Sequence, residues 1–245
     1  MKKTDDRGFT EKTLIYDLYR LMFEAHNAFM EASIPYIANG GTLLGAVRHK
    51  GMIPWDDDLD VQVDVSYEKQ LMSKSFKQTL AEHGIVIRKS PNGWYKLLFK
   101  PEHRTSVHIA DMDIFISKFK TIDGVPHIVL TGNAGKYWPK SIFKVSDTFP
   151  LTKYKFGKIQ IIGPKNANPY LNLSYGKSWK TVGYITMDDD HMDLDEPIKV
   201  KVTKFVAAKD YYDPRVEGSI GSGGDGVQIL PRKGNVVYDE KSFTA

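Results

Sequence analysis

The sequence predicts an α/β fold, of the α+β kind, with helices and strands both present along the chain. Residues 11–32 place apolar side chains at intervals of three and four, the period of an amphipathic helix. Residues 58–65 alternate strictly between polar and apolar side chains, the period of a half-buried strand. A short strand at 34–38 runs through paired glycines into a helix at 42–49. Such a strand–glycine–helix passage often forms a turn that faces a phosphate.

The remaining elements follow in order along the chain. We expect Thr10 to cap the first helix and Ser66 to cap a second one. Between residues 85 and 99, two strand patterns flank a Pro-Asn-Gly turn, which is typical of a hairpin. Further elements expected are strands at 107–117, 127–130 and 158–162, and a short helix with a turn at 169–179.

The composition is that of a globular protein. The chain has 245 residues, of which 41% are hydrophobic and 26% charged, and it contains no cysteine. Disulfides, cysteine-ligated zinc, iron–sulfur clusters and thiol catalysis are therefore excluded. We expect a main domain over residues 1–186 and an appendage or lid over residues 187–245, where the strand and helix patterns weaken and a glycine-rich stretch follows.

The net charge of +4 is mild, and the basic residues are not gathered into a polyanion-binding tail. We therefore expect no nucleic-acid partner. Residues 1–8 lack the apolar core of a secretory signal, and no apolar run approaches the roughly 20 residues of a membrane-spanning helix. The sequence thus predicts no transmembrane segment, and a location in the cytoplasm or at the periphery of a membrane.

The stretch that carries chemistry is residues 39–63, which read NGGTLLGAVRHKGMIPWDDDLDVQV. Asp58 and Asp60 are two residues apart in the predicted strand, so their side chains share a face at a backbone separation of about 7 Å. Two such carboxylates can converge on a hard divalent cation, Mg²⁺ or Mn²⁺, which prefers oxygen ligands. The alternative is a solvated acidic turn. The glycine turn and the shared face favour the metal site.

A third carboxylate is expected from another strand, because phosphoryl transfer draws metal and nucleophile from more than one element. The strand at 107–117 offers Asp113 as a general base or an additional metal ligand, with Asp111 on the same face as the runner-up. The alternative for either residue is an ordinary carboxylate at a strand edge. Elsewhere, we expect Trp94 and Trp138 to be packing residues, and Trp55 either to brace the acidic loop or to stack on a ligand.

The segment from Gly40 to Val61 resembles the signature of the LicD/fukutin family, which has a nucleotidyltransferase-like core. Two later stretches agree more loosely: Asp113-Ile114-Phe115 is similar to the family's third acidic strand, and residues 169–179 are similar to its closing tyrosine–glycine–tryptophan segment. The resemblance covers residues 23–181. It implies a nucleotidyltransferase-like mixed sheet flanked by helices, with the catalytic domain at 1–186.

The resemblance also implies an activity. It indicates a transferase that moves a phospho-substituent, phosphocholine or an alditol phosphate, from a CDP-linked donor to a hydroxyl of a glycan or glycoconjugate. In that interpretation Asp58 and Asp60 hold Mg²⁺ or Mn²⁺ on the donor pyrophosphate, and Asp113 activates the acceptor hydroxyl.

The same interpretation predicts which residues bind the phosphates of the donor. Backbone N–H groups of Gly40, Gly41 and Thr42 would approach the phosphates, and glycines suit this because a Cβ would block the approach. Arg48 and Lys50 would neutralise phosphate charge. The alternative for these two is a role as surface cations near the end of a helix.

Two other functions remain open. One keeps the fold but transfers the nucleotide itself to a sugar or alditol phosphate, with release of pyrophosphate. The other is a non-catalytic nucleotide-binding or scaffold module. In the tail, His191 and residues 188–190 are interpreted as a solvated loop rather than a second metal site.

Overall fold

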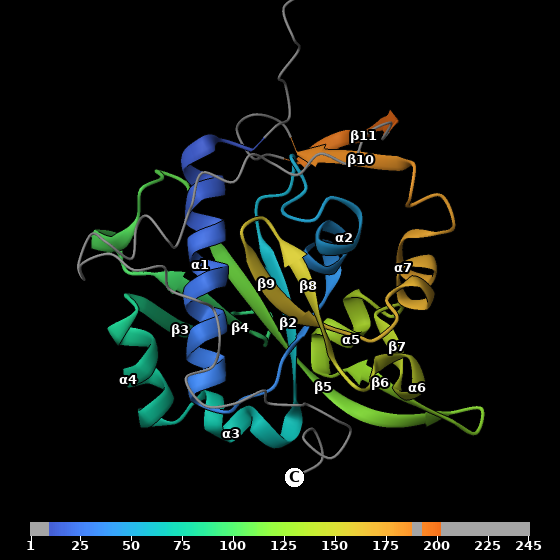
Figure 1. Cartoon of the computed structure of the whole chain (residues 1–245), viewed down its shortest axis with the longest axis horizontal. Helices are drawn as coiled ribbons and strands as arrows, with labels where there is room; N and C mark the ends of the chain where they lie inside the picture. Colours follow the sequence, from blue (N-terminus) through green and yellow to red (C-terminus); the bar gives the residue numbers. More distant parts are fainter. Residues whose placement is uncertain (1–9, 188–192, 202–245) are drawn as a thin grey trace, which may run out of the picture.

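The computed structural model describes residues 10–187 and 193–201 (Figure 1). At its centre is a seven-stranded mixed sheet flanked by helices, which confirms the predicted fold class. Figure 1 shows α1 and α4 beside β3 and β4, and α5, α6 and α7 beside β6 and β7. The main hydrophobic core joins the sheet to α1, α2, α7 and the hairpin of β8 and β9.

The elements have the following bounds. The helices are α1 (Lys12–Glu31), α2 (Gly40–Arg48), α3 (Glu68–Leu71), α4 (Lys74–Glu82), α5 (Gly132–Tyr137), α6 (Val145–Thr148) and α7 (Asn168–Tyr175), with short 3₁₀ turns η1 (Val65–Tyr67) and η2 (Pro101–His103). The strands are β1 (Ile37–Ala38), β2 (Leu59–Asp64), β3 (Ile85–Lys89), β4 (Tyr95–Phe99), β5 (Asp111–Ile122), β6 (Val125–Leu130), β7 (Ile142–Lys144), β8 (Thr152–Phe156), β9 (Ile159–Gly163), β10 (Val182–Met187) and β11 (Asp193–Lys201).

The order of the main strands is β1-β2-β5-β4-β3, and the far half of β5 pairs with β6, which pairs with β7. β2 and β5 run parallel, whereas the other neighbours in this sheet are antiparallel. The expected hairpin at 85–99 is present as β3 and β4. The parallel pair at the centre is the feature that positions the candidate site.

Helix α1 buries the predicted apolar stripe: Leu14, Leu18, Leu21, Ala25 and Phe29. The prediction that Thr10 caps this helix is wrong. Glu11 takes the cap position without a side-chain hydrogen bond. Thr10 instead donates its hydroxyl to the carbonyl of Asp56 at 2.8 Å, so it ties the start of α1 to the acidic loop.

The segment after β2 is also not one helix capped by Ser66. Asp64 accepts both the backbone N–H (3.0 Å) and the hydroxyl (2.6 Å) of Ser66, which produces the turn η1. The helical stretch then breaks, and Ser73 caps α4 by accepting from the N–H of Phe76 at 3.1 Å. A carboxylate accepts more strongly than a hydroxyl, so Asp64 takes over the role predicted for Ser66.

Two strands differ from the prediction. β2 is covered on both faces, since Gln62 and Asp64 on its polar face are buried as well as the valines opposite. β5 begins at Asp111 rather than 107 and runs on to Ile122, because its far half pairs with β6. The residues just before it are not strand, and Val107 is 89% exposed.

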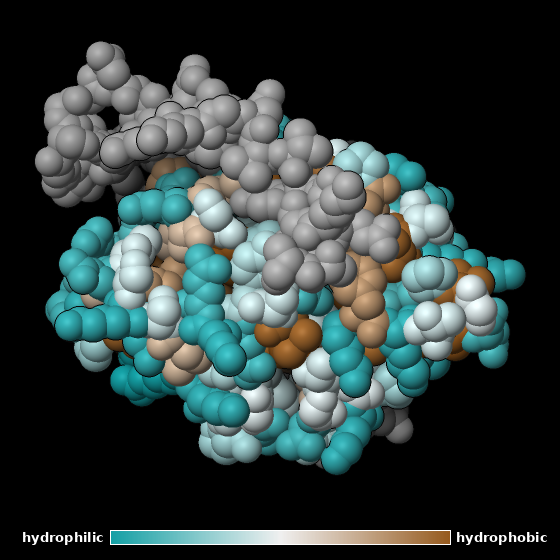
Figure 2. All heavy atoms as spheres, turned by 90° about the horizontal axis from the view of Figure 1, so that it is seen from below, coloured by the Kyte–Doolittle hydropathy of each residue, from teal (hydrophilic) through white to brown (hydrophobic). Residues whose placement is uncertain are grey.

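The end of the described chain is a hairpin in which β10 pairs with β11. This hairpin spans residue 187, where we predicted the appendage to begin, and most of residues 187–245 lie outside the described part, as do His191 and the glycine-rich stretch. The domain division therefore stays a prediction. In the face drawn in Figure 2, hydrophilic side chains cover most of the coloured surface and apolar ones form small patches. None of the helices described is both long and apolar enough for a membrane crossing.

His26 of α1 is a buried titratable group in the core. Its Nδ1 lies 2.8 Å from the hydroxyl of Tyr36, which also accepts the N–H of Ile162. Burial, and then the charge of Lys153, lower the pKa of His26 from 6.5 to about 4. The fold therefore holds this imidazole neutral.

We predict that His26 makes the fold sensitive to acid. A histidine whose pKa falls on folding contributes fully above its unfolded pKa, and that contribution is lost as the pH drops from 6.5 through about 4. The loss should reach ~3 kcal/mol in urea unfolding of the wild type, relative to His26→Gln, which cannot be protonated. Parallel pH profiles for the two proteins would contradict the assignment.

Candidate active site

The candidate site lies where β2 and β5 run side by side. In the parallel register Asp60 stands directly opposite Asp113, and Asp58 immediately precedes β2. One carboxylate oxygen from each of the three lies within 4.8 Å of the others. Asp113 is buried, and Asp58 and Asp60 are half-buried. The structure thus brings together the three carboxylates that the sequence analysis singled out.

The protonation of these carboxylates is strongly perturbed. Burial and the negative charges of Asp56 and Asp113 raise the pKa of Asp60 to about 8, although the N–H of Gly41 opposes this. Burial, and then the charges of Asp60 and Asp57, raise the pKa of Asp58. Burial also raises the pKa of Asp113. Such crowded acids are destabilised as anions unless a cation neutralises them.

The donor set fits a hard divalent cation. It consists of carboxylate oxygens from Asp58, Asp60 and Asp113, close enough to share one ion, without thiolate or imidazole ligands in the group. Mg²⁺ and Mn²⁺ prefer this chemistry and keep further positions for water or substrate oxygens. These residues could therefore hold the predicted metal.

Lys96 of β4 supplies a positive charge on the β5 side of the site. Its ammonium forms ion pairs with Asp111 and with Asp113, the latter at 2.9 Å between Nζ and Oδ1. These carboxylates raise the pKa of Lys96 even though burial lowers it. Asp111, the runner-up, thus has a cationic partner, and among the described residues it is not part of the convergent group that contains Asp113.

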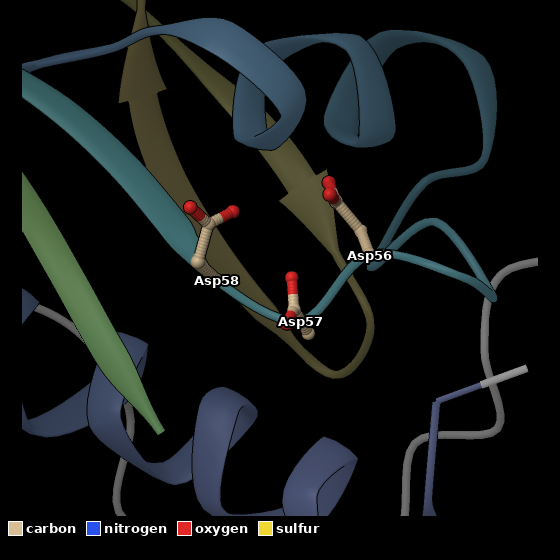
Figure 3. A group of neighbouring side chains, drawn as sticks. All are labelled: Asp56, Asp57 and Asp58. Atoms are coloured by element: carbon tan, nitrogen blue, oxygen red, sulfur yellow. The ribbon is translucent and has the colours of Figure 1, made fainter. Parts of the chain in front are cut away.

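The acidic loop before β2 adds a second carboxylate group. Asp56, Asp57 and Asp58 also come within 4.8 Å of one another, and Figure 3 shows Asp56 and Asp58 projecting to the side of the loop where α2 lies. Burial, then the charges of Asp58 and Asp57, raise the pKa of Asp56, while Arg48 lowers it. The sequence analysis did not single out Asp56. The only feature of the sequence that could have indicated a site role for Asp56 is its position in the same acidic run.

The paired glycines allow two of these acids to approach the start of α2. Gly40 has φ +50°, and a Cβ on it would lie 2.0 Å from Oδ2 of Asp60. A Cβ on Gly41 would lie 2.3 Å from Oδ2 of Asp56. The N–H of Gly41 donates to Asp60 at 3.2 Å, where the positive end of the helix dipole favours an anion. The glycines thus make room for two aspartates, and the phosphate contact expected of them stays a prediction.

Thr42 acts on the same strand from within the helix. It is buried, and its hydroxyl oxygen accepts the backbone N–H of Asp60 at 2.8 Å. This contact fixes the start of β2 against α2. The sequence analysis expected the backbone N–H of Thr42 to bind phosphate, and the structure assigns its side chain this positioning contact.

A buried amide connects three segments beside the carboxylates. Oδ1 of Asn39, the N-cap of α2, accepts from the N–H of Gly40 at 2.8 Å, from the hydroxyl of Ser141 at 3.0 Å and from the hydroxyl of Tyr170. Sequence reasoning missed all three side chains. Asn39 carried one signal, since asparagine before a helix is a favoured cap.

Arg48 and Lys50 are not brought to the three carboxylates. The guanidinium of Arg48 is buried and donates to the carbonyls of Trp179 (2.8 Å) and Val182 (3.0 Å). The ammonium of Lys50 donates to the carbonyl of Val47 at 2.9 Å. Arg48 therefore fastens α2 to the segment after α7, and the phosphate roles predicted for both residues remain untested.

A cavity of about 460 Å³ opens beside the carboxylates. Its lining consists of the three aspartates with Asn39, Gly40, Phe115, Leu130, Tyr137, Trp138, Pro139, Lys140, Ser141, Tyr170, Ser174 and Tyr175. One end is thus acidic and one wall aromatic. A volume of this size suits a small-molecule ligand.

The tryptophans differ in role. Trp94 is buried against Phe115, with ring centroids 5.7 Å apart, as a packing residue should be. Trp138 packs on both of them but is 44% exposed and lines the cavity, so packing alone does not describe it. Trp55 contacts His49, and a Cβ on Gly183 would lie 2.5 Å from it, which agrees with a bracing role.

The mixed sheet, the glycine-started helix and the acids on adjoining strands define a nucleotidyltransferase-like domain. A family model described as LicD/FKTN/FKRP, nucleotidyltransferase domain, matches residues 33–166. The chain belongs to this family.

Curated relatives agree with that assignment. An uncharacterized protein of Rickettsia typhi is 31% identical over 200 residues, which are 80% of this chain and 57% of that protein. Lipopolysaccharide cholinephosphotransferase LicD of Haemophilus influenzae is 48% identical over 46 residues, 19% of this chain and 17% of LicD. Human ribitol 5-phosphate transferase FKRP is 35% identical over 81 residues, 32% of this chain and 16% of FKRP. The chain thus matches only part of each relative's length.

We predict that Gly40→Ala disrupts the site more than its matched control. Gly132 has a similar φ, +57°, but a Cβ there would meet nothing within 4 Å. Both substitutions should cost about 1 kcal/mol for the left-handed backbone. Only Gly40→Ala should also displace Asp60 and lose Mn²⁺-dependent stabilisation in thermal unfolding. Equal retention of that stabilisation in both variants would show that Asp60 does not need the glycine.

The raised pKa of Asp60 gives a second prediction. A carboxyl group whose pKa rises from 3.8 to about 8 on folding stabilises the metal-free protein below the unfolded value, and this contribution is lost as the pH rises through about 8. In EDTA, the Tm should therefore fall between about pH 6.5 and 8.5, above the range in which His26 titrates. Asp60→Asn should flatten this fall, and Asp123→Asn, in an exposed turn, should not. An unchanged slope in Asp60→Asn would contradict the prediction.

Proposed function

We propose that the protein is a metal-dependent transferase that moves a phospho-substituent from a CDP-linked donor to a hydroxyl of a glycan or glycoconjugate. The substituent is phosphocholine or an alditol phosphate. The observation that carries the proposal is the convergence of Asp58, Asp60 and Asp113 within 4.8 Å at one end of a ligand-sized cavity. A binding scaffold has no physical need for three crowded carboxylates.

The names of two relatives support this class of reaction. LicD is a cholinephosphotransferase and FKRP a ribitol 5-phosphate transferase, so both names describe the transfer of a phosphorylated small alcohol. The part of this chain that is similar to LicD, 46 residues, accounts for 17% of that protein. The relatives therefore support the reaction class, and donor and acceptor remain part of the proposal.

The residues divide the work as follows. Asp58 and Asp60 hold Mg²⁺ or Mn²⁺, which when bound supplies positive charge to the donor pyrophosphate. Asp113, held by Lys96, accepts the proton of the acceptor hydroxyl. The hydroxyl oxygen forms a bond to the phosphorus of the transferred group, the bond from that phosphorus to the bridging oxygen breaks, and CMP leaves with the electron pair.

A second candidate is transfer of the nucleotide itself to a sugar or alditol phosphate. This second reaction is supported by the description of the family model as a nucleotidyltransferase domain. The products distinguish the two reactions, because phospho-substituent transfer from a CDP donor releases CMP, whereas nucleotide transfer from CTP releases pyrophosphate.

We predict that Asp58→Asn abolishes turnover while the fold persists. The assay incubates CDP-choline, CDP-ribitol or CDP-glycerol with Mn²⁺ and a glycan acceptor and measures CMP release. Loss of a metal-binding carboxylate should lower the rate by about 100-fold or more. The Tm without metal should stay the same or rise, since a repulsive charge is removed.

Asp123→Asn is the matched control, because Asp123 is an exposed aspartate in the β5–β6 turn, outside the convergent acids. It should retain wild-type turnover. Normal turnover in Asp58→Asn would overturn the site assignment. Release of pyrophosphate from CTP, without CMP release from any CDP donor, would replace the proposed reaction with nucleotide transfer.

A further inference from the structure

Among the described residues, the side-chain cations nearest the acids in space or in sequence are already engaged with other groups. Lys96 is paired with Asp111 and Asp113, Arg48 with two backbone carbonyls, and Lys50 with the carbonyl of Val47. Two N–H groups at the start of α2 are also used, since Gly40 donates to Asn39 and Gly41 donates to Asp60. A donor pyrophosphate would bring further negative charge to this acidic end, so besides a bound metal ion it would favour a side-chain cation that is not already engaged.

Among the described residues that line the cavity, Lys140 is the only basic one. It is exposed, and no acidic side chain in the described ranges forms an ion pair with it. Its ammonium can therefore turn to a ligand in the cavity without breaking a structural contact. Lysine suits this task because its long stem carries a compact point charge.

Lys140 belongs to a strongly basic part of the chain. Residues 136–180 contain nine lysines and a single acid, Asp147, whereas the whole protein has a net charge of only +4. All nine lysines are exposed: Lys136, Lys140, Lys144, Lys153, Lys155, Lys158, Lys165, Lys177 and Lys180. These exposed lysines make residues 136–180 a source of positive potential, which attracts anionic ligands.

The backbone around Lys140 is fixed relative to the carboxylates. Its carbonyl accepts the N–H of Ile142 at 2.9 Å and the hydroxyl of Ser174, on α7, at 3.1 Å. The next residue, Ser141, is buried and donates to Oδ1 of Asn39 at 3.0 Å. Hydrogen bonds to α7 and to the start of α2 thus hold the backbone of Lys140 in place beside the acidic cluster.

We propose that Lys140 is the residue that binds and positions the donor phosphates. Its ammonium forms a charge-assisted hydrogen bond with an oxygen of a nucleoside diphosphate group in the cavity that the three carboxylates also line. This inference rests on the proposed function for the identity of the donor. It replaces Arg48 and Lys50 as the expected phosphate cations.

Calorimetric titration of CDP, UDP, ADP and CTP in the presence of Mn²⁺ tests the inference without requiring turnover. The proteins are the wild type, Lys140→Gln, Lys140→Arg and the control Lys136→Gln, which removes an exposed lysine of α5 that does not line the cavity. Lys140→Gln should weaken binding of the preferred nucleotide about tenfold. Lys140→Arg should restore most of the affinity, and Lys136→Gln should bind like the wild type.

Turnover provides a second readout with any CDP donor that reacts. Lys140→Gln should raise the KM for the donor and leave the KM for the acceptor unchanged, which a general loss of structure would not do. Equal affinity in Lys140→Gln and the wild type, an equal loss in Lys136→Gln, or no nucleotide binding by the wild type would overturn the inference. Nucleotide binding that depends on Lys140, without transfer from any CDP donor, would contradict the proposed function alone.

Discussion

Mutual repulsion among buried carboxylates is the constraint around which this domain is organised. Asp58, Asp60 and Asp113 are held within 4.8 Å of one another, with Asp56 adding charge beside them. Separate contacts make the arrangement tolerable: Lys96 pairs with Asp113, and the N–H of Gly41 donates to Asp60. Each contact stabilises the ionised form only in part, so the acids keep raised pKa values. The crowded acids would therefore be stabilised further by a bound cation.

The scaffold that imposes this crowding is simple. Parallel pairing of β2 with β5 sets Asp60 opposite Asp113, and a shift of one residue would turn one of the two to the other face of the sheet. Helix α2 holds the register from the other side, because Thr42 accepts the N–H of Asp60. The positions of the acids in the site therefore follow from the main-chain geometry of β2, β5 and α2.

Sequence patterns predicted the periodic helices and strands and the motifs that lie within one short stretch of chain. The helical period predicted α1, alternation predicted β2, and the resemblance predicted the family and the mixed sheet. The phosphate roles expected of Arg48 and Lys50 stay untested, and no local sequence pattern shows that Arg48 donates to the carbonyl of Trp179, 131 positions away. Contacts between residues about 100 positions apart, such as Ser141 with Asn39, leave no local pattern.

The amide of Asn39 joins the start of α2 to the loop before β7 and, through Tyr170, to α7. The family match ends at residue 166, before α7 begins. The stretch of chain that lines this cavity therefore extends beyond the residues that the family model matches. A fragment that ended at 166 would keep every one of the clustered acids, yet it would lack the wall that Tyr170, Ser174 and Tyr175 provide and the carbonyl partners that keep Arg48 buried.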